Sequence, residues 1–288
     1  MTEELKIGRR TIKVTHPEKV LFPEAKVTKL DLARHCERVA PVMLPYLSGR
    51  PLALQAFPNG VGGHGFFLKA VPDYFPDWVQ RATLSKRGGK ITHALAEDAA
   101  TLVYLAGQNV VTVHGWLSKA EEPRKPHILI IDLDPSEEGG FADVRAAARD
   151  AGERLRDAGL ATYAMTTGSR GIHVVCPLRR GPSFTDVHRF AKALARQMVE
   201  DNRKKLTLEY IKANREDKIY VDVNRNAYAQ HAVVPYLGPG LRGRCSRRLP
   251  LRCRSRKMAL RGKLPFMLPR TERTRPTLRG SRFHPRLE

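Results

Sequence analysis

The chain has 288 residues and a mass of 32.4 kDa, with 51 Lys+Arg against 29 Asp+Glu and a formal net charge of +22. Its 42% hydrophobic and 28% charged residues are typical of a globular protein and exclude a disordered or fibrous one. The sequence has no apolar run long enough to span a membrane, and its N-terminus lacks the apolar core of a signal peptide. We therefore predict a cytoplasmic protein with a polyanionic partner.

The positive charge is concentrated at one end of the chain. Residues 237–288 contain 16 Lys+Arg and 2 Asp+Glu, a net charge of +14, which leaves only +8 for residues 1–236. This last part is rich in Arg, Pro and Gly and shows neither a helical nor a strand period. We predict a folded domain over residues 1–236 and a disordered basic tail over residues 237–288.

The first half of the domain alternates between strand-like and helix-like segments. Thr28 and Asp31 form a capping-box pattern, which predicts a helix from there to about Tyr46. The preceding segment HPEKVLFPEA is predicted as a loop. A second helix is predicted over residues 97–107, and strands are predicted over residues 11–14, 51–57 and 110–116.

The second half has a clearer pattern. HILIIDLD predicts an apolar strand ending in acid, TYAMTT and GIHVVCPL predict a hairpin, and KIYVDV predicts a last strand. Helices are predicted over residues 141–158, over residues 183–201 and over the segment LTLEYIKANR. Strands and helices mixed in this way predict an α/β or α+β domain with a partly antiparallel sheet.

Two acidic residues stand at the end of the apolar strand, in Ile131-Asp132-Leu133-Asp134. Residues two apart on a strand share a face and lie about 6–7 Å apart, so both carboxylates project together while Leu133 faces the core. Such carboxylates repel each other unless a cation lies between them, and hard oxygen ligands suit Mg²⁺ or Mn²⁺. Taken alone, the pair is equally well explained as a strand end that meets an Asp-Pro turn.

Asp222 adds a third carboxylate inside the alternating strand 219–223. A buried acid there is costly unless it is paired or bound to a ligand, although an acid on the solvent face is the simpler explanation of Asp222 alone. Together with Asp132 and Asp134 it predicts a site for two cations that stabilise the attacking and leaving oxygens of a phosphoryl displacement. Polymerases and nucleases both use such sites, so the carboxylates do not choose between them.

Two further segments have the composition of nucleotide or nucleic-acid contacts. The segment TTGSRGIH (166–173) lies between the carboxylates; its glycines let backbone N–H groups approach phosphate oxygens, and its polar side chains add donors. A two-glycine turn is also typical of an ordinary hairpin. Phe66, Phe67 and Lys69 are suited to stacking on a base and contacting a phosphate, although two core phenylalanines would show the same spacing.

The order of these motifs resembles that of a known family. The primase-polymerase domain of bacterial ligase D proteins, in the archaeo-eukaryotic primase superfamily, shows the same succession of segments: VTHPEKVLFP, VTKLDL, GFFLK, DAATLVYLA, VHGW, IIDLDPS, TTGSRGIHVV and VDVNRNAYAQ. The resemblance runs from about residue 11 to Tyr236. It implies an α+β fold with a primase-polymerase-like mixed or antiparallel sheet core flanked by helices.

The resemblance implies a template-directed nucleotidyl transferase that extends or fills DNA ends in non-homologous end joining, using NTP or dNTP and two Mn²⁺ or Mg²⁺ ions. It assigns catalysis and the metal ions to Asp132, Asp134 and Asp222. It assigns nucleotide binding to His114, Thr167, Ser169, His173 and Arg215, and we add Arg170 because it is a further donor in the same segment. It assigns binding of the DNA 5′-phosphate to Lys19 and Lys29, and it places Phe66 and Phe67 near the template. We add Lys69 to the DNA-binding residues because it is suited to contacting a phosphate. The implied partners are 5′-phosphorylated DNA ends, Ku and a separate ATP-dependent DNA ligase, in the nucleoid and without a membrane.

The sequence departs from the family at several positions. Some relatives carry basic residues where this chain has Gln55 and Gln230. Relatives also continue after Pro-Tyr with a Ser-Val-Arg-Ala-type segment whose arginine reaches the triphosphate, whereas Leu-Gly-Pro-Gly follows Tyr236 here. One cytosine inserted before TCG GTC CGG GCC gives CTC GGT CCG GGC, which encodes Leu-Gly-Pro-Gly. We hypothesise that residues 237–288 are a frameshifted reading of a GC-rich gene, and resequencing that finds an intact frame would refute this.

Three functions therefore compete. The leading one is a polymerase of the ligase D type, impaired if the lost arginine is needed. The second is an inactive relative that binds DNA ends through Lys19, Lys29 and the basic tail. The third is a metal-dependent nuclease, which fits the carboxylates but not the resemblance. Neither a ligase lysine motif nor a nuclease module is recognisable, so any end joining is expected to come from other chains.

Overall fold

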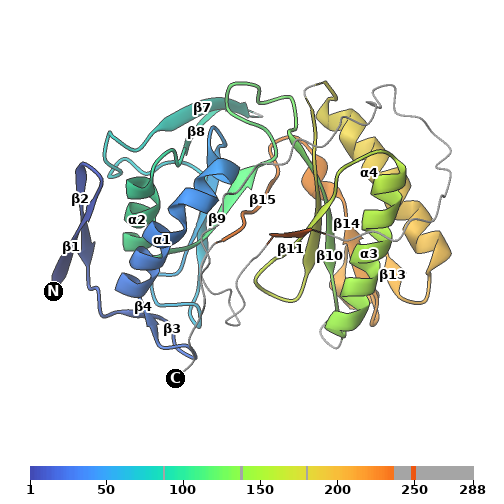
Figure 1. Ribbon diagram of the computed structural model, residues 1–288, viewed down its shortest axis with the longest axis horizontal. Helices are drawn as coiled ribbons and strands as arrows, with labels where there is room; N and C mark the ends of the chain where they lie inside the picture. Colours follow the sequence, from blue (N-terminus) through green and yellow to red (C-terminus); the bar gives the residue numbers. More distant parts are fainter. Residues whose placement is uncertain (87, 137–138, 180, 237–247, 251–288) are drawn as a thin grey trace, which may run out of the picture.

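The computed structural model describes residues 1–86, 88–136, 139–179, 181–236 and 248–250. In this part of the chain, four α-helices and two larger β-sheets make up two halves, which lie side by side in Figure 1. The fold is α+β with antiparallel sheets flanked by helices, as predicted. No helix among the described residues combines the length and the apolarity that crossing a membrane requires.

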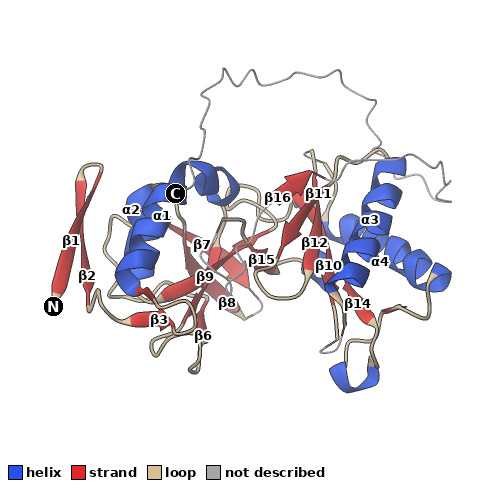
Figure 2. Cartoon of the chain, turned by 60° about the horizontal axis from the view of Figure 1, so that its bottom comes forward, coloured by secondary structure: helices blue, strands red, loops and turns tan. Residues whose placement is uncertain are grey.

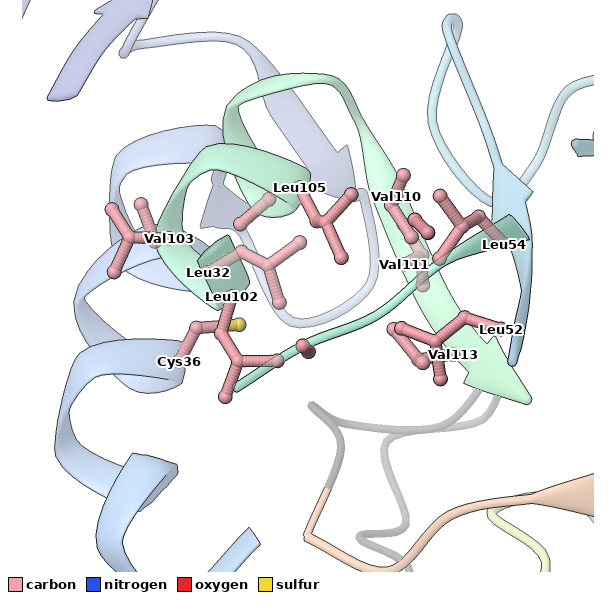
Figure 3. Packing of buried hydrophobic residues seen from close by; sticks show 14 of the residues in the cluster. Leu32, Cys36, Leu52, Leu54, Leu102, Val103, Leu105, Val110, Val111 and Val113 are labelled. Atoms are coloured by element: carbon pink, nitrogen blue, oxygen red, sulfur yellow. The ribbon is translucent and has the colours of Figure 1, made fainter. Parts of the chain in front are cut away.

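The first half is built on a four-stranded antiparallel sheet. Its order is β15 (His231–Val233), β9 (Val110–Trp116), β5 (Leu52–Ala56) and β6 (Phe66–Leu68). The helices α1 (Lys29–Leu47) and α2 (Ala99–Gly107) pack on β5 and β9, and their leucines and valines share one core with those strands (Figure 3). As predicted, α1 begins at a capping box in which Thr28 N–H donates to Asp31 at 2.9 Å.

Three two-stranded ribbons complete the first half, all antiparallel. They are β1 (Thr2–Ile7) with β2 (Arg10–Thr15), β3 (Val20–Phe22) with β4 (Val27–Thr28), and β7 (Arg81–Lys86) with β8 (Gly89–Ala94). The segment HPEKVLFPEA is therefore not a loop throughout, because β3 lies inside it. Its Leu21 and Phe22 are buried in the core of the first half, and that burial favours the strand.

The second half is built on a six-stranded sheet. Its order is β13 (Leu206–Thr207), β14 (Ile219–Asp222), β10 (Ile128–Asp134), β12 (Ile172–Pro177), β11 (Tyr163–Thr166) and β16 (Arg248–Pro250). All neighbours are antiparallel except β13 and β14, and β11 with β12 form the predicted hairpin. The helices α3 (Phe141–Asp157) and α4 (Phe184–Asp201) cover one face of this sheet (Figure 2).

The alternation along β10 decides which side chains face the first half. Leu129, Ile131 and Leu133 are buried against α3 and α4. Because successive side chains point to opposite faces, Asp132 and Asp134 point away from the helices. Ile130 on that same face packs with Leu117 and Ala232 of the first half. The acidic end of β10 therefore faces the junction of the two sheets.

An asparagine extends the edge of β10 where its partner strand ends. β14 stops at Asp222, opposite Asp132. Beyond it, the fully buried side chain of Asn226 accepts from Ile130 N–H at 2.9 Å and donates to Ile130 O at 2.6 Å. The side-chain amide thus replaces a strand neighbour and satisfies both backbone groups of Ile130.

One predicted helix is wrong. LTLEYIKANR is not a helix; it contains β13 and the 3₁₀ turn Lys212–Asn214. Side chains there bond the local backbone and compete with a helix, since Glu209 N–H donates to Thr207 Oγ1 and Ile211 N–H to Glu209 Oε1. In the predicted disordered tail, residues 248–250 form β16 against β11, while the rest of 237–288 lies outside the described residues.

Candidate active site

A cavity of about 350 Å³ opens where the two sheets meet. This volume lies in the range of small-molecule binding sites. One wall comes from the six-stranded sheet and its loops, namely Asp132, Asp134, Thr167, Gly168, Ser169, Gly171, His173, Tyr210, Arg215, Tyr220, Asp222 and Arg225. The other wall comes from the four-stranded sheet, namely Gln55, Thr112, His114, His231, Ala232 and Val233.

Two carboxylates face each other in the first of these walls. Asp132 and Asp222 are direct partners across β10 and β14, and their side chains are only 13% and 11% exposed. His173, the partner of Asp132 on β12, places its Nε2 3.3 Å from Asp132 Oδ1. Arg225 Nε lies 3.7 Å from Asp132 Oδ2 and 3.8 Å from Asp222 Oδ2. The register of three adjacent strands thus places Asp222, Asp132 and His173 in one row.

The pKa values of these two carboxyl groups shift in opposite directions. Burial opposes the ionisation of Asp132, but His173 and Arg225 outweigh it and hold the pKa of Asp132 below its usual value. Burial raises the pKa of Asp222; the N–H of Asn224 opposes this rise and the charge of Asp132 adds to it. Two neighbouring buried carboxyl groups of this kind are stabilised in their ionised form by a nearby cation.

Asp134 lies in the same cavity but has a different partner. It is 46% exposed, and its Oδ2 accepts from Arg215 Nη1 at 3.1 Å. The buried Arg215 also donates to the carbonyl oxygens of Glu209 and Tyr210, at 2.9 and 2.6 Å, and stacks on the Tyr220 ring at 4.2 Å. Arg215 thereby holds the segment after β13 against the end of β10.

The donors of this wall have the chemistry of a hard-cation site. Asp132, Asp222 and Asp134 offer carboxylate oxygens, which Mg²⁺ and Mn²⁺ prefer. Across the described residues, however, no three His, Cys, Asp or Glu side chains lie close enough together to hold a metal ion as they stand. Asp132 and Asp222 fit such an ion as a facing pair, whereas Asp134 is engaged by Arg215.

The loop between β11 and β12 depends on two glycines. Gly168 has φ +81°, and a Cβ on Gly171 would lie 2.8 Å from the carbonyl oxygen of Leu133. Thr167 Oγ1 donates to Gly171 O at 3.2 Å and closes the turn. Thr167, Ser169 and His173 reach the cavity as a group, whereas Arg170 lies in the same loop outside the cavity lining.

The opposite wall is uncharged near neutral pH. The rings of His114 and His231 lie 5.2 Å apart, and Phe67 lies 5.2 Å from His114 and 5.8 Å from His231. Burial is the main cause that lowers the pKa of His114 to about 3 and that of His231 to about 4. His114 Nε2 and His231 Nδ1 are buried and have no hydrogen-bond partner among the described residues.

The aromatic pair predicted for DNA contact is divided by its strand. Phe66 and Phe67 are adjacent on β6, so their side chains point to opposite faces, and both are partly exposed. Only Phe67 meets the histidines of the cavity. Lys69 follows the strand, and its charge contributes to the lowered pKa of His231.

The two predicted phosphate-binding lysines lie together but outside the cavity lining. Lys29, the first residue of α1, donates its N–H to Lys19 O at 2.8 Å. Its side chain is buried, and burial followed by the charge of Lys19 lowers the pKa of Lys29, against the opposing effect of Glu18. Two ammonium groups held in proximity suit an anionic ligand.

Several cavity residues escaped the sequence analysis. Thr112, Tyr210, Tyr220 and His231 come from segments whose contacts the sequence does not reveal. Arg225 had a local signal, because it stands three residues after Asp222 and pairs with it. The structure therefore gathers the predicted acidic and phosphate-loop residues and adds a second wall to them.

Comparison with known families shows to which family the chain belongs. A model of the LigD primase-polymerase domain matches residues 28–245, beyond Tyr236 at its end. The chain belongs to the LigD primase-polymerase family. Both the family and the α+β fold agree with the resemblance seen in the sequence.

The chain is similar to several LigD proteins. It is 33% identical over 245 residues to the multifunctional non-homologous end joining DNA repair protein LigD of Mycobacterium tuberculosis, over 82% of this chain and 32% of that protein. It is 28% identical over 226 residues to the bifunctional LigD of Bacillus subtilis, over 78% of this chain and 36% of that protein. The chain thus spans about a third of the length of the curated relatives it matches.

The polymerase domain of Mycobacterium tuberculosis ligase D, solved in complex with DNA, has a similar structure. The TM-score is 0.76 at 29% identity, over 83% of this chain and 86% of that chain. The similarity therefore includes both halves of the domain.

Proposed function

We propose that this chain is a template-directed nucleotidyl transferase that extends or fills DNA ends in non-homologous end joining. The observation that carries the proposal is the pairing of Asp132 with Asp222 in a cavity that also contains the Thr167–Gly171 turn. Carboxylates that can hold cations, next to a glycine-containing turn that can approach a phosphate, suit phosphoryl transfer. Membership of the LigD family favours polymerisation over nuclease activity.

In the proposed reaction, the primer 3′-hydroxyl oxygen forms a bond to the α-phosphorus, and the bond to the β-phosphate oxygen breaks to release pyrophosphate. Asp132 and Asp222, with Asp134, would hold two Mn²⁺ or Mg²⁺ ions, which supply charge stabilisation for the attacking and leaving oxygens. Thr167, Ser169 and His173 bind the triphosphate by hydrogen bonds, with Arg170 and Arg215 adding charge. His114 contacts the nucleotide from the neutral wall.

The proposed DNA substrate is a 5′-phosphorylated gap or overhang. Lys19 and Lys29 bind the 5′-phosphate, since their positive charges lie together at the start of α1. Phe67, with Phe66 and Lys69 on the same edge, lies on the template side. Ku and an ATP-dependent DNA ligase on another chain are the proposed protein partners, in keeping with the end-joining role that the names of the relatives state.

Primer extension on a 5′-phosphorylated gapped duplex with Mn²⁺ and either NTP or dNTP tests the proposal. We expect incorporation that follows the template, that stops when EDTA removes the metal, and that Asp132→Ala abolishes. Binding of the duplex without incorporation would point to an inactive end-binding relative. A shortened primer would point to a nuclease.

A further inference from the structure

The carboxyl group of Asp222 receives two hydrogen bonds on one of its oxygens. Asn224 N–H donates to Asp222 Oδ1 at 2.8 Å, and the hydroxyl of Tyr220 donates to the same atom at 3.3 Å. A tyrosine hydroxyl has one proton to donate and accepts through its oxygen. The hydroxyl proton of Tyr220 is therefore used in the bond to Asp222, and the hydroxyl oxygen of Tyr220 can still accept a hydrogen bond.

The acceptor side of that hydroxyl is also occupied. Asn224 Nδ2 donates to Tyr220 Oη at 3.0 Å. Asn224 thus acts on Asp222 twice, directly through its backbone and indirectly through its side chain. The Asn224 side chain also interacts with the imidazole of His188 on α4, so the chain of contacts continues from the cavity to a helix.

These bonds determine which oxygen of Asp222 faces its partner. With Oδ1 occupied by two donors, Oδ2 lies on the side of Arg225, at 3.8 Å from Nε. The same Arg225 atom is 3.7 Å from Asp132 Oδ2. The two Oδ2 atoms therefore share one positively charged neighbour and face a common position.

We propose that Asn224 is a positioning residue, whose side-chain amide orients the Tyr220 hydroxyl so that Asp222 presents Oδ2 toward Asp132. This inference rests on the proposed function, in which Asp222 is a metal ligand. Groups that hydrogen-bond a metal-ligating carboxylate fix its orientation, and their loss typically reduces metal affinity or activity about 10–100-fold. The proposal assigns that effect to an exposed residue that lies outside the cavity lining.

The experiment compares wild type, Asn224→Ala, Tyr220→Phe and the double variant, with Asn202→Ala after α4 as the matched control. Binding of Mn²⁺ alone is measured by electron paramagnetic resonance of the free ion, and kcat and KM are measured by primer extension. We expect Asn224→Ala to weaken Mn²⁺ binding about 10-fold and to lower kcat about 10-fold, with KM for the nucleotide nearly unchanged. Asn202→Ala keeps wild-type values.

The double variant shows whether the Asn224 amide acts on Mn²⁺ binding through the Tyr220 hydroxyl. If the amide acts through the hydroxyl, the double variant is no weaker in Mn²⁺ binding than Tyr220→Phe. Multiplied effects, or wild-type Mn²⁺ affinity in Asn224→Ala, would overturn the inference. Because Asn224 is exposed, its variants should keep the wild-type melting temperature. A wild type that binds Mn²⁺ but extends no primer refutes the proposed function separately, since Mn²⁺ binding still reports on Asn224.

Discussion

The two walls of the cavity differ in the way they present polar groups. The six-stranded sheet brings carboxylates together and surrounds them with Arg225, Arg215 and His173. The four-stranded sheet presents the imidazoles of His114 and His231, which are neutral near pH 7. One wall therefore carries paired charges, and the other presents neutral imidazoles.

The difference follows from how the walls are made. In the six-stranded sheet, opposite charges lie within 4 Å across neighbouring strands and loops, so burial of each charge is offset by a partner. In the four-stranded sheet, two histidines and a phenylalanine pack ring against ring. Burial then favours the neutral imidazole. Substitutions in the two walls should consequently differ in the size of their effect and in the property that they change.

The largest effect is expected for Asp132→Asn, which keeps the shape of the side chain and removes its charge. Loss of several kcal/mol of charge stabilisation corresponds to a fall in kcat of about 10³-fold or more. Single-turnover primer extension measures it, and circular dichroism checks the fold. If Asp132→Asn retained more than a tenth of the wild-type rate, the charged wall would not be the catalytic one.

Arg215→Met should have the next largest effect. It removes the partner of Asp134 and two bonds to backbone carbonyls, and hydrogen bonds to charged groups contribute about 1.5–3 kcal/mol each. We expect kcat/KM to fall about 100-fold and the amides of residues 209–214 to exchange faster with deuterium. Arg189→Met, which breaks an exposed ion pair with Asp186, serves as the control. Unaltered exchange at 209–214 would show that Arg215 does not hold this segment.

Lys29→Met tests whether the first half binds the 5′-phosphate of DNA through a charged side chain. Loss of one charge-assisted phosphate contact should weaken binding of a 5′-phosphorylated gapped duplex about 10-fold. Binding of the same duplex with a 5′-hydroxyl should hardly change, and fluorescence anisotropy measures both. Lys6→Met on β1 removes an exposed lysine as the control. Equal losses for the two duplexes would argue against a phosphate site at Lys29.

The smallest effect is expected on the neutral wall and concerns stability. The folded pKa of His114, about 3, lies below the unfolded value of about 6.5, so below pH 6.5 the unfolded chain binds a proton that the folded chain does not. Stability is therefore lost as pH falls from about 6.5 toward 3. In His114→Gln, the fall in Tm between pH 7 and pH 5 should be smaller by about 2–4 °C. An identical fall in both proteins would contradict a buried neutral imidazole.

Sequence patterns predicted the features whose signal is local. The capping box at Thr28, the β11–β12 hairpin and the shared face of Asp132 and Asp134 each depend on residues within a few positions of one another. The register that sets Asp222 opposite Asp132 spans 90 positions and carries no local signal. For the same reason the sequence did not reveal that Arg215 would pair with Asp134.

The neutral wall was the harder part to predict. His231 reaches the cavity because β15 returns from the second half to pair with β9. The segment LTLEYIKANR, which includes β13, was predicted as a helix. The side chains of Thr207 and Glu209 instead accept hydrogen bonds from the nearby backbone, and Arg215 donates to the carbonyl oxygens of Glu209 and Tyr210.

The amide bridge between Asn226 and Ile130 has a consequence for the order in which the protein is built. It joins residues 96 positions apart and lies just beyond the strand pair that carries Asp132 and Asp222. Contacts of such long sequence separation close late, because the entropy of the intervening loop must be overcome first. A nascent chain synthesised only to the end of α4 contains Asp132 but lacks Asp222 and Asn226. Asp132 and Asp222 therefore pair only after the chain as far as Asn226 has been synthesised, and shorter nascent chains lack both the pair and the bridge.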